Sequence, residues 1–275
     1  MMRSLYSAIT GLRNHQTRMD VIGNNISNVN TVAFKASRVV FQDIYSQTLS
    51  PASGSSGTIG GMNPKQVGLG TALATIDVMQ TSSASQYTGE ALDLSIEGDG
   101  FFILNDKGQT TYTRAGNFYT DSGDFLVSSN GAFVQGYPVD ADGTITSTAL
   151  DKIYIDPDYY DVTINSAGQV VGLDKATDDK VIIGQLAVAT FANPNGLEKV
   201  GINSYRSTVN SGDPANSTPG VDGAGTLNPG TLEMSNVDLA AQFTDMIVTQ
   251  RGFQANSRII TTTDSMLEEL VNLKR

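Results

Sequence analysis

The chain has 275 residues, a formal net charge of −11 at pH 7, 39% hydrophobic residues and 16% charged residues, a composition that predicts one or two folded domains. It contains no cysteine and one histidine, which excludes disulfides, thiol catalysis, zinc–thiolate sites and two-histidine metal sites. The acidic balance disfavours nucleic acid as a partner, and the longest apolar-rich stretch, 181–192, is too short for the roughly 20 residues of a membrane-spanning helix.

The first 32 residues predict an N-terminal helix with a coiled-coil seam. Apolar residues recur every seven positions on a segment without proline, and a second set lies three positions further on. Gly11, Gly23 and the asparagine-rich stretch 24–31 weaken this helix, so it needs a packing partner. The predicted seam consists of Leu5, Ala8, Leu12, His15, Met19, Ile22, Ile26 and Val29.

The middle of the chain predicts an antiparallel β domain between two connectors. Residues 33–80 are expected to form an extended connector, with many glycines, prolines and serines between 51 and 70. A return connector is expected at 206–234. Between them, at 81–205, short strand-like runs alternate with turn sequences. The expected strands are 100–104, 110–113, 125–127, 152–155, 181–183 and 185–191.

Four turns in this region share one pattern, a polar first residue and a glycine at the fourth position. The pattern predicts type I turns of bulged hairpins, with each glycine in the left-handed conformation. The turns span 105–108, 120–123, 140–143 and 165–168.

Residues 235–275 predict a second long helix with a heptad seam. A capping-box-like sequence at Ser235–Asp238 is expected to start it, with Asp238 in the first turn, and Lys274 and Arg275 suit the negative end of the helix dipole. The apolar positions of its seam are Leu239, Met246, Phe253, Ile260 and Leu267, and the stripe is widened by Phe243, Ile247, Met266 and Leu270.

Candidate catalytic and metal sites are weak by comparison. Asp140 and Asp142 lack the spacing of an EF-hand loop, so a plain hairpin turn is favoured. The aspartates between 156 and 161 and at 178–179 could act as a hydrolase pair only if the fold set their separation, and solvated loop charges are the better interpretation. His15 is favoured as a packed side chain. We therefore predict no enzyme activity, no cofactor and no metal.

Seven stretches of this sequence resemble the motifs of a known protein family. Residues 20–35 resemble the N-terminal signature of the bacterial flagellar basal-body rod and hook protein family, and 235–240 with 250–256 resemble its C-terminal signature. Residues 98–103 and 112–118 resemble its middle region, and 220–225 with 230–233 its return segment. One departure is Ala33, where the family often has glycine. The matching signature residues are Asn24, Asn25, Asn28, Phe34, Lys35, Ser235, Asn236, Val237, Asp238, Leu239, Gln250, Arg251 and Asn256.

The resemblance implies a structural subunit that polymerises with copies of itself into a tube. The two terminal helices would form an inner coiled coil, the connectors a joint layer and the β domain the outer shell. Other expected partners are rod subunits, the hook cap, the hook–filament junction and the flagellar type III export apparatus. Export by that route needs no cleaved signal peptide, and residues 1–6 do not begin one.

Within the family, the sequence resembles short hook proteins of the Gram-positive type in residues 1–6 and 60–70. This implies a hook subunit, a universal joint that transmits motor torque to the filament outside the cell. A distal rod subunit, part of the drive shaft, is the alternative. An unrelated alternative is a surface adhesin, for which Tyr159 and Tyr160 would be the aromatic platform.

Overall fold

The computed structural model describes residues 2–54, 60–139, 145, 147, 149–175 and 178–273. These residues form two compact units. The helical unit contains Met1–Ser27, Ser37–Met79 and Val237–Arg275, and the β unit contains Asn28–Ala36 and Gln80–Asn236. The expected combination of terminal helices and a central antiparallel β region is confirmed.

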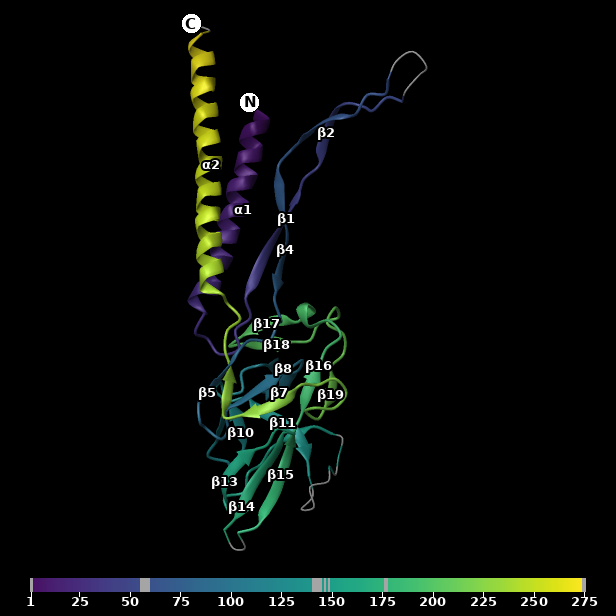
Figure 1. The fold of residues 1–275 in the computed structure, drawn as a ribbon, viewed down its shortest axis with the longest axis vertical. Coiled ribbons are helices and arrows are strands. Elements are labelled where there is room, and N and C mark those ends of the chain that lie inside the picture. Colours follow the sequence, from purple (N-terminus) through teal and green to yellow (C-terminus); the bar gives the residue numbers. More distant parts are fainter. Residues whose placement is uncertain are drawn as a thin grey trace. The chain divides into compact units, whose positions relative to one another are not determined.

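The helical unit consists of two long helices and a β ribbon (Figure 1). At 1.5 Å per residue the longer helix extends about 51 Å. Within the described residues, neither helix contains a stretch long and apolar enough to cross a membrane. The elements are α1 (Met2–Ser27), β1 (Ser37–Asp43), β2 (Ser46–Ser50), β3 (Lys65–Gly68), β4 (Thr71–Val78) and α2 (Leu239–Asn272).

Both helices are bounded by polar side chains, at positions that differ from the predicted ones. Helix α1 ends at Ser27, and residues 28–30 form a turn in which Thr31 N–H donates to the Asn28 carbonyl oxygen at 3.1 Å. Val29 therefore lies outside the helix, which corrects its place on the seam. Helix α2 begins at Leu239 because the Asp238 carboxylate caps it, accepting from the backbone N–H groups of Ala240 at 2.9 Å and Ala241 at 3.2 Å. The start predicted at Ser235 was four residues early, and Lys274 and Arg275 lie outside the described residues.

The segment that was expected to be an irregular connector contains a β ribbon. Strand β1 pairs with β4 over Ser37–Asp43, with a bulge between Val40 and Phe41, and β2 pairs with β3. The pairing continues to a bridge between Ser53 and Met62. A two-stranded ribbon is marginally stable alone in water, so its packing against α1 contributes to its order.

The β unit is an antiparallel sheet system with short accessory pairs (Figure 1). The main path runs β13-β14-β15-β11-β7-β8-β18-β17. The bounds are β5 (Ser85–Tyr87), β6 (Leu94–Glu97), β7 (Phe101–Asp106), β8 (Gln109–Thr113), β9 (Phe118–Thr120), β10 (Leu126–Ser128), β11 (Phe133–Pro138), β12 (Asp151–Lys152), β13 (Tyr159–Ile164), β14 (Gln169–Asp174), β15 (Lys180–Leu186), β16 (Val188–Thr190), the 3-10 helix η1 (Pro194–Gly196), β17 (Glu198–Gly201), β18 (Ser204–Arg206), β19 (Ala215–Ser217), β20 (Thr226–Pro229) and β21 (Thr231–Glu233).

Most of the predicted strands are confirmed, and two regions differ. Residues 152–155 contribute only the end of β12 and a bridge between Phe125 and Tyr154. The return connector expected at 206–234 contains β19, β20 and β21. The confirmed strands are those at 100–104, 110–113, 125–127, 181–183 and 185–191, which appear as β7, β8, β10, β15 and β16.

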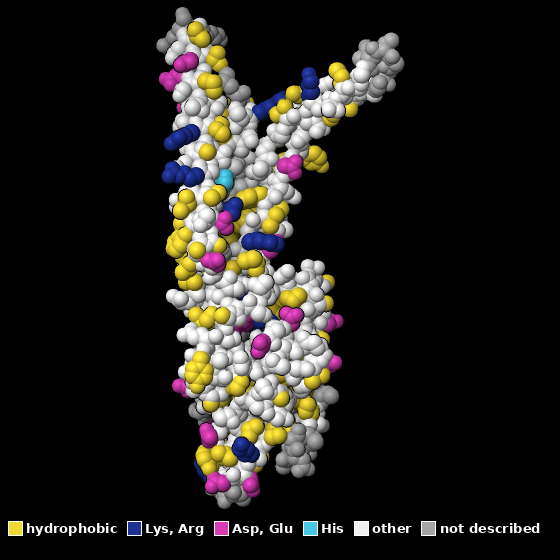
Figure 2. Space-filling view, in the orientation of Figure 1, with side chains coloured by type: hydrophobic (Ala, Val, Ile, Leu, Met, Phe, Trp, Pro, Cys, Tyr) yellow, Lys and Arg dark blue, Asp and Glu magenta, His cyan; other side chains and the backbone are white. Residues whose placement is uncertain are grey.

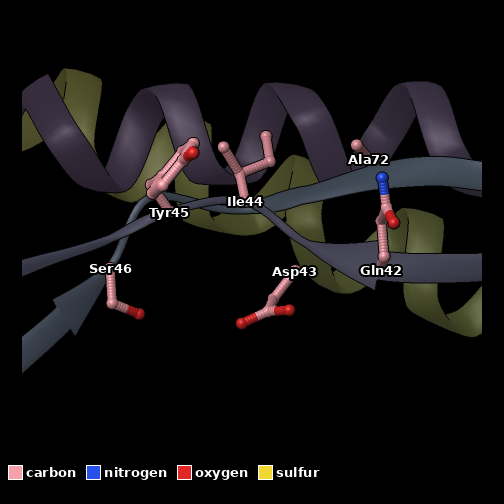
Figure 3. A pocket seen from close by; sticks show the side chains of 6 residues that line it. All are labelled: Gln42, Asp43, Ile44, Tyr45, Ser46 and Ala72. Carbon is pink, nitrogen blue, oxygen red and sulfur yellow. The ribbon is translucent and has the colours of Figure 1, made fainter.

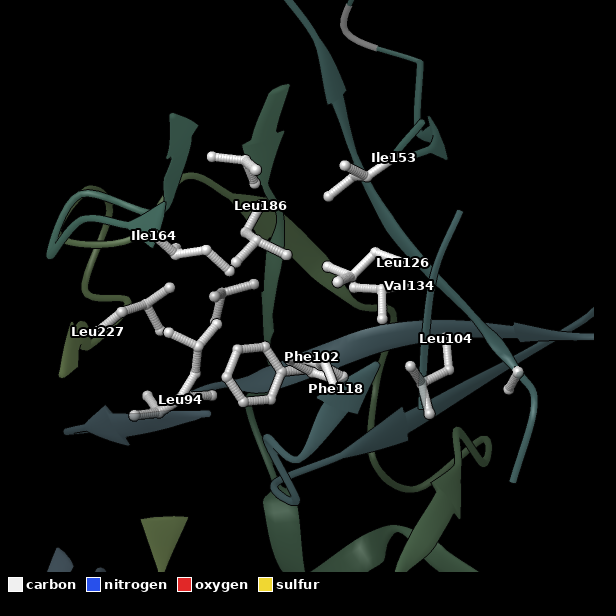
Figure 4. Packing of buried hydrophobic residues seen from close by; sticks show 14 of the residues in the cluster. Leu94, Phe102, Leu104, Phe118, Leu126, Val134, Ile153, Ile164, Leu186 and Leu227 are labelled. Atoms are coloured by element: carbon white, nitrogen blue, oxygen red, sulfur yellow. The ribbon is translucent and has the colours of Figure 1, made fainter. Parts of the chain in front are cut away.

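Two clusters of buried side chains form the core of the β unit. The larger cluster contains Leu94, Phe102, Leu126 and Leu186, whose side chains converge in Figure 4. Phe102 and Phe118 meet edge to face in it, with ring centroids 5.0 Å apart. The smaller cluster lies around Phe101, Tyr112, Phe191 and Tyr205. Because adjacent residues of a strand point to opposite faces, Phe101 and Phe102 of β7 supply one ring to each cluster.

The four predicted turns have different outcomes. The turn at 165–168 is confirmed, with Gly168 at φ 81° and its N–H donating to the Asn165 carbonyl oxygen at 2.9 Å. At 105–108 both Lys107 (φ 50°) and Gly108 (φ 88°) are left-handed, which corrects a bulged type I turn to a two-residue loop of the I′ kind. At 120–123 the left-handed residue is Asp124, one position after the glycine. The turn at 140–143 lies outside the described residues.

Gly116, in one of the family-like motifs, is required by a close backbone approach. A Cβ atom at this position would lie 1.9 Å from the Leu94 carbonyl oxygen. We expect Gly116→Ala to lower the free energy of unfolding of the β unit by about 3 kcal/mol, through overpacking and loss of the hydrogen bond from Leu94 N–H to the Gly116 carbonyl oxygen. Urea denaturation followed by near-UV circular dichroism of the tyrosines would measure it. Gly184→Ala is the control, because its Cβ would make only an ordinary 3.5 Å contact, and equal losses would contradict the prediction.

Candidate functional site

Helices α1 and α2 run antiparallel side by side (Figure 1). Asn25 near the end of α1 donates to the Gln242 side-chain oxygen near the start of α2, at 3.1 Å. Further along, Arg18 pairs with Asp245 at 2.9 Å. Gly11 lies opposite Asn256, so residue numbers increase along α1 in the direction in which they decrease along α2. Because α2 is longer, its last two turns extend beyond the first residue of α1.

Two glycines lie where a side chain of the opposite helix comes close to the backbone. A Cβ atom on Gly252 would lie 2.6 Å from the His15 ring, and a Cβ atom on Gly11 would lie 2.7 Å from the Asn256 amide nitrogen. These glycines weaken each helix in isolation, but they leave room for the side chain on the opposite helix. Gly23 has no such role, because a Cβ atom there would have no described neighbour within 4 Å.

We expect Gly252→Leu to disrupt the pairing of α1 with α2. The larger side chain would displace the His15 ring or separate the helices, at an overpacking cost of about 1–3 kcal/mol. Far-UV circular dichroism of the full chain during urea titration would show an earlier loss of helix. Gly23→Leu is the matched control, and it should gain up to about 1 kcal/mol from helix propensity. If both variants gained stability, the close approach at Gly252 would be refuted.

The seam predicted on α1 coincides with its less exposed face. Ala8 and Ile22 are buried, and the other apolar seam positions within α1 are half-buried. These half-buried positions are Leu5, Leu12, Met19 and Ile26.

On α2 the residues closest to α1 are largely polar, which the sequence did not predict. Thr249 and Thr263 are 0% and 2% exposed, and each hydroxyl donates to the backbone carbonyl four residues earlier. By contrast, Phe243 and Ile247 are 50% and 58% exposed. Among the predicted α2 positions, Met246, Ile260 and Leu267 are half-buried, and Leu239, Phe253, Met266 and Leu270 are exposed.

Asn25 joins three elements of the helical unit through one side chain. Its amide nitrogen donates to the Ser37 carbonyl oxygen at 2.8 Å as well as to Gln242, and its amide oxygen accepts from Ser37 N–H at 3.0 Å. The side chain is buried, so its replacement by an apolar residue would leave several of these polar groups without a partner.

A buried charge cluster lies in the β unit. Lys35, Arg114 and Glu233 are 0%, 3% and 1% exposed. The Lys35 ammonium lies 2.6 Å from the Glu233 carboxylate, and the Arg114 guanidinium lies 3.3 Å from the same group. Arg114 also donates to the carbonyl oxygens of Gly100 at 2.9 Å and Gly98 at 2.6 Å. Burial lowers the pKa of Lys35, and the adjacent carboxylate opposes that shift.

This cluster holds three segments of the chain that lead out of the β unit. Lys35 also donates to the Thr81 carbonyl oxygen at 2.7 Å, and Glu233 accepts from Ser83 N–H at 3.1 Å. Asn236 adds a further hydrogen bond between these segments, because its side-chain oxygen accepts from Ala36 N–H at 2.7 Å. The β unit consists of Asn28–Ala36 and Gln80–Asn236, so these hydrogen bonds join three of its four chain ends, those at 36, 80 and 236.

Ala33, next to the cluster, adopts a left-handed conformation with φ 55°. Its N–H donates to the Glu233 carbonyl oxygen at 2.8 Å, so the conformation is held by the same segment. We expect Ala33→Gly to raise the stability of the β unit by about 1 kcal/mol, because glycine adopts this φ without steric cost. Ala36→Gly is the control, since Ala36 has an ordinary φ and should lose stability. Thermal denaturation of both variants would measure the change in stability of the β unit. A loss of stability with Ala33→Gly would contradict the prediction.

Three family models match this chain. A flagella basal body rod protein model matches residues 5–35, a flagellar hook protein FlgE/F/G D1 domain model matches 95–172, and a flagellar basal body rod FlgEFG protein C-terminal model matches 228–273. The chain is 50% identical over 276 residues to the flagellar basal-body rod protein FlgG of Bacillus subtilis, with both chains covered completely. The chain belongs to the flagellar rod and hook protein family. The resemblance found in the sequence is thereby confirmed.

Both rod and hook proteins are similar to this family member. The flagellar basal-body rod protein FlgG of Borreliella burgdorferi is 38% identical over 280 residues, and its flagellar hook protein FlgE is 33% identical over 441 residues. Each comparison covers all of both chains. The hook alignment is longer than this chain, so that hook protein contains segments that have no counterpart here.

The family signature residues divide between the two units. In the β unit, Phe34 lies under the Lys199 ammonium, 4.9 Å from its ring centroid, and Asn28 and Asn236 shape the segment ends. In the helical unit, Asn25 and Asp238 make the bonds described above, and Asn256 lies opposite Gly11. The signature residues Asn24, Leu239, Gln250 and Arg251 are exposed on the helices. Ser235 and Val237, which precede α2, are half-buried.

The alternative catalytic and binding sites gain no support from the geometry. Asp156 and Asp158 lie in one turn, and Asp178 accepts from the Tyr160 hydroxyl. Tyr159 and Tyr160 are neighbours on β13 and so point to opposite faces, which is unsuited to a flat aromatic platform. Within the part of the chain that the structure describes, no group of three or more acidic or histidine side chains could hold a metal. Asp140 and Asp142 lie outside it.

One surface hollow lies in the β ribbon and is lined by few charges. It has a volume of about 490 Å³, lies where β1 leads into β2 and is lined by residues 42–46 and Ala72. In Figure 3, Asp43 and Ser46 point away from Ile44. Asp43 is the single charged side chain of this described lining, so the hollow lacks the paired groups of acid–base catalysis.

Proposed function

We propose that this chain is a structural subunit that assembles with copies of itself through its terminal helices, forming part of the flagellar axis. The observation that carries the proposal is the arrangement of α2, whose small polar residues face α1 while larger apolar residues face outward. Figure 2 shows hydrophobic side chains along the exposed side of α2, most densely toward its first turns. Burial of such a stripe against another copy would stabilise a coiled-coil tube.

The expected layers of the tube follow the sequence division. Residues 1–32 and 235–275 would form the inner coiled coil, 33–80 and 206–234 the joint layer, and 81–205 the outer shell. The predicted partners are copies of this chain, rod subunits, the hook cap, the hook–filament junction and the type III export apparatus. Weak isolated helices suit this route, since a chain exported unfolded gains order at assembly.

Two assignments within the family, hook subunit and distal rod subunit, differ in where the subunit lies along the flagellar axis. The resemblance of residues 1–6 and 60–70 to short hook proteins of the Gram-positive type implies a hook subunit. The distal rod assignment is supported by the 50% identity to the FlgG rod protein of Bacillus subtilis, a chain of nearly the same length. The longer FlgE hook proteins of Borreliella burgdorferi and Treponema pallidum are 33% and 32% identical.

Electron microscopy of basal bodies from cells that lack this chain would distinguish the two. A complete rod without a hook would identify a hook subunit, and a shortened rod would identify a rod subunit. Normal rods and hooks together would contradict the proposed function. Complementation with the wild-type gene controls for effects on neighbouring genes.

A further inference from the structure

The single histidine of the chain occupies an unusual place between the two helices. His15 is half-buried on α1, and its ring faces the backbone of Gly252 on α2, where a Cβ atom would lie 2.6 Å from Cε1 and Nε2. The ring nitrogen Nδ1 is buried and has no hydrogen-bond partner among the described residues. A neutral imidazole tolerates an unpaired acceptor nitrogen better than an imidazolium tolerates an unpaired N–H.

We propose that His15 is a proton-sensitive contact that opens the α1–α2 pair when it becomes charged. Protonation would place a positive charge and an unsatisfied Nδ1–H in a site whose described residues offer no acceptor for it. The glycine opposite lets the helices come close enough for the ring to be enclosed, and it supplies no side chain that could neutralise the charge. The device acts within one chain and goes beyond the proposed assembly function.

The charged groups around His15 favour its neutral form. On α1, Arg18 lies one turn away and, together with burial, lowers the pKa of His15. On α2 the nearby acidic group is Asp245, which is already paired with Arg18 at 2.9 Å. Arg251 lies beside Gly252 and donates to the Gln254 side chain at 3.2 Å.

Further charged groups lie on α1, on α2 and on the strands packed against α1. Arg3 on α1 and Arg258 and Asp264 on α2 occupy exposed positions. On β1 and β4, Arg38 and Asp77 lie 3.6 Å apart and pair with each other. Asp43 ends β1, and Arg13 and Asp20 lie on exposed positions of α1. Burial is the larger cause of the lowered His15 pKa, and Arg18 is the second.

The direction of the pH effect follows from linkage. With a folded-state pKa below the ordinary value of 6.5, His15 binds fewer protons in the paired helices than in separated ones. Well above pH 6.5 the residue is neutral in both states, and the pairing is unaffected. As the pH falls below 6.5, the separated state gains protons first, and the pairing weakens. His15 is the one histidine of the chain, and imidazole is the side chain whose ordinary pKa lies between pH 7 and 5.

The experiment uses the full chain with one spin label on each helix. The chain has no cysteine, so Arg13→Cys and Gln254→Cys at exposed positions give two unique labels. Pulsed electron paramagnetic resonance would follow their separation between pH 7 and 5, in dilute and in sedimented protein. Selective ¹³C labelling of histidine Cε1 gives one resonance, which reports the His15 pKa directly.

We expect the short label distance to be lost as the pH falls, and the ¹³C midpoint to lie below its value in urea. His15→Gln should keep the short distance at pH 5. If α1 and α2 of His15→Gln do not pair at pH 7, Arg18→Gln provides the test of the proposal. Removal of the Arg18 charge should raise the pH midpoint of the ¹³C titration of His15. Any one of four results would overturn the proposal. These are a label distance that stays short at pH 5, a ¹³C midpoint at or above its value in urea, equal opening of His15→Gln at pH 5, and the absence of a short distance at pH 7.

Discussion

Glu233→Ala should be the most destabilising single substitution in the β unit. The Glu233 carboxylate is the partner of two buried cations, Lys35 at 2.6 Å and Arg114 at 3.3 Å. Removing it leaves both charges without a counter-ion in a site closed to water. Breaking a buried ion pair by removing one partner costs about 3–5 kcal/mol, a large part of the stability of an ordinary domain. We expect the variant to be unfolded or to denature at much lower urea concentration.

A matched ion pair on the surface of the same unit provides the control. Arg206 and Glu198 lie 2.7 Å apart, with side chains that are 51% and 54% exposed. Glu198→Ala should cost no more than about 1 kcal/mol, because solvent screens exposed pairs. The chain has no tryptophan, so near-UV circular dichroism of tyrosine would follow the unfolding. Losses within about 0.5 kcal/mol of each other, a margin near the usual error, would refute the importance of burial.

Two further variants separate charge from packing. Glu233→Gln keeps the size of the side chain and an oxygen for Ser83 N–H, and it removes only the charge. It should therefore lose nearly as much stability as Glu233→Ala. The triple variant Lys35→Met, Arg114→Met and Glu233→Met removes all three charges and should recover much of the loss, because apolar replacements of a buried ion cluster are often tolerated.

The sequence predicted the elements of this fold better than their contacts. Heptad spacing indicates helices because apolar residues of one face recur with a fixed period, and both helices were found. Their ends depended on single side chains: Asp238 caps α2, where a capping box at Ser235 was expected. Val29 fits the heptad, but the turn at Asn28 removes it from the helix.

The charge cluster could not be predicted, because its members are far apart in the chain. Lys35 and Glu233 are separated by 198 positions, and nothing in the local sequence of either residue indicates that they pair. Lys35 was singled out only by its family motif. The threonines of α2 were missed for a different reason, since a search for apolar periodicity passes over Thr249 and Thr263, although their hydroxyls are satisfied by their own helix.

The close approach at Gly252 was not predicted from the sequence. A glycine within a helical pattern weakens the helix, but it also permits close packing where a large side chain lies opposite it on a partner helix. The distinction requires the partner helix, and nothing in the heptad of α1 shows that His15 lies opposite Gly252 rather than one turn away. Gly23, with the same local sequence effect and no such described neighbour, shows that the local signal alone is ambiguous.

Phe243→Asp should abolish assembly while leaving the subunit folded. Phe243 is 50% exposed on α2, away from the residues that pack against α1. In the proposed tube its ring is buried against another copy. An aspartate there would lose about 2–3 kcal/mol of apolar burial and place an unpaired charge in the contact, which costs several kcal/mol more. Since each 1.4 kcal/mol is a factor of ten, the critical concentration for assembly should rise by at least about 100-fold.

The effect repeats at every subunit added, so cells with this variant should be non-motile. Sedimentation of purified protein over a concentration series would measure the change, and melting of the β unit should stay at the wild-type value. Ser257→Asp, which adds the same charge at an exposed polar position of α2, should assemble close to normally. Ile260→Asp and Phe253→Asp should also block assembly, but half-buried Ile260 should in addition weaken the α1–α2 pair. Normal filaments from Phe243→Asp would show that the outward stripe of α2 is not an assembly interface.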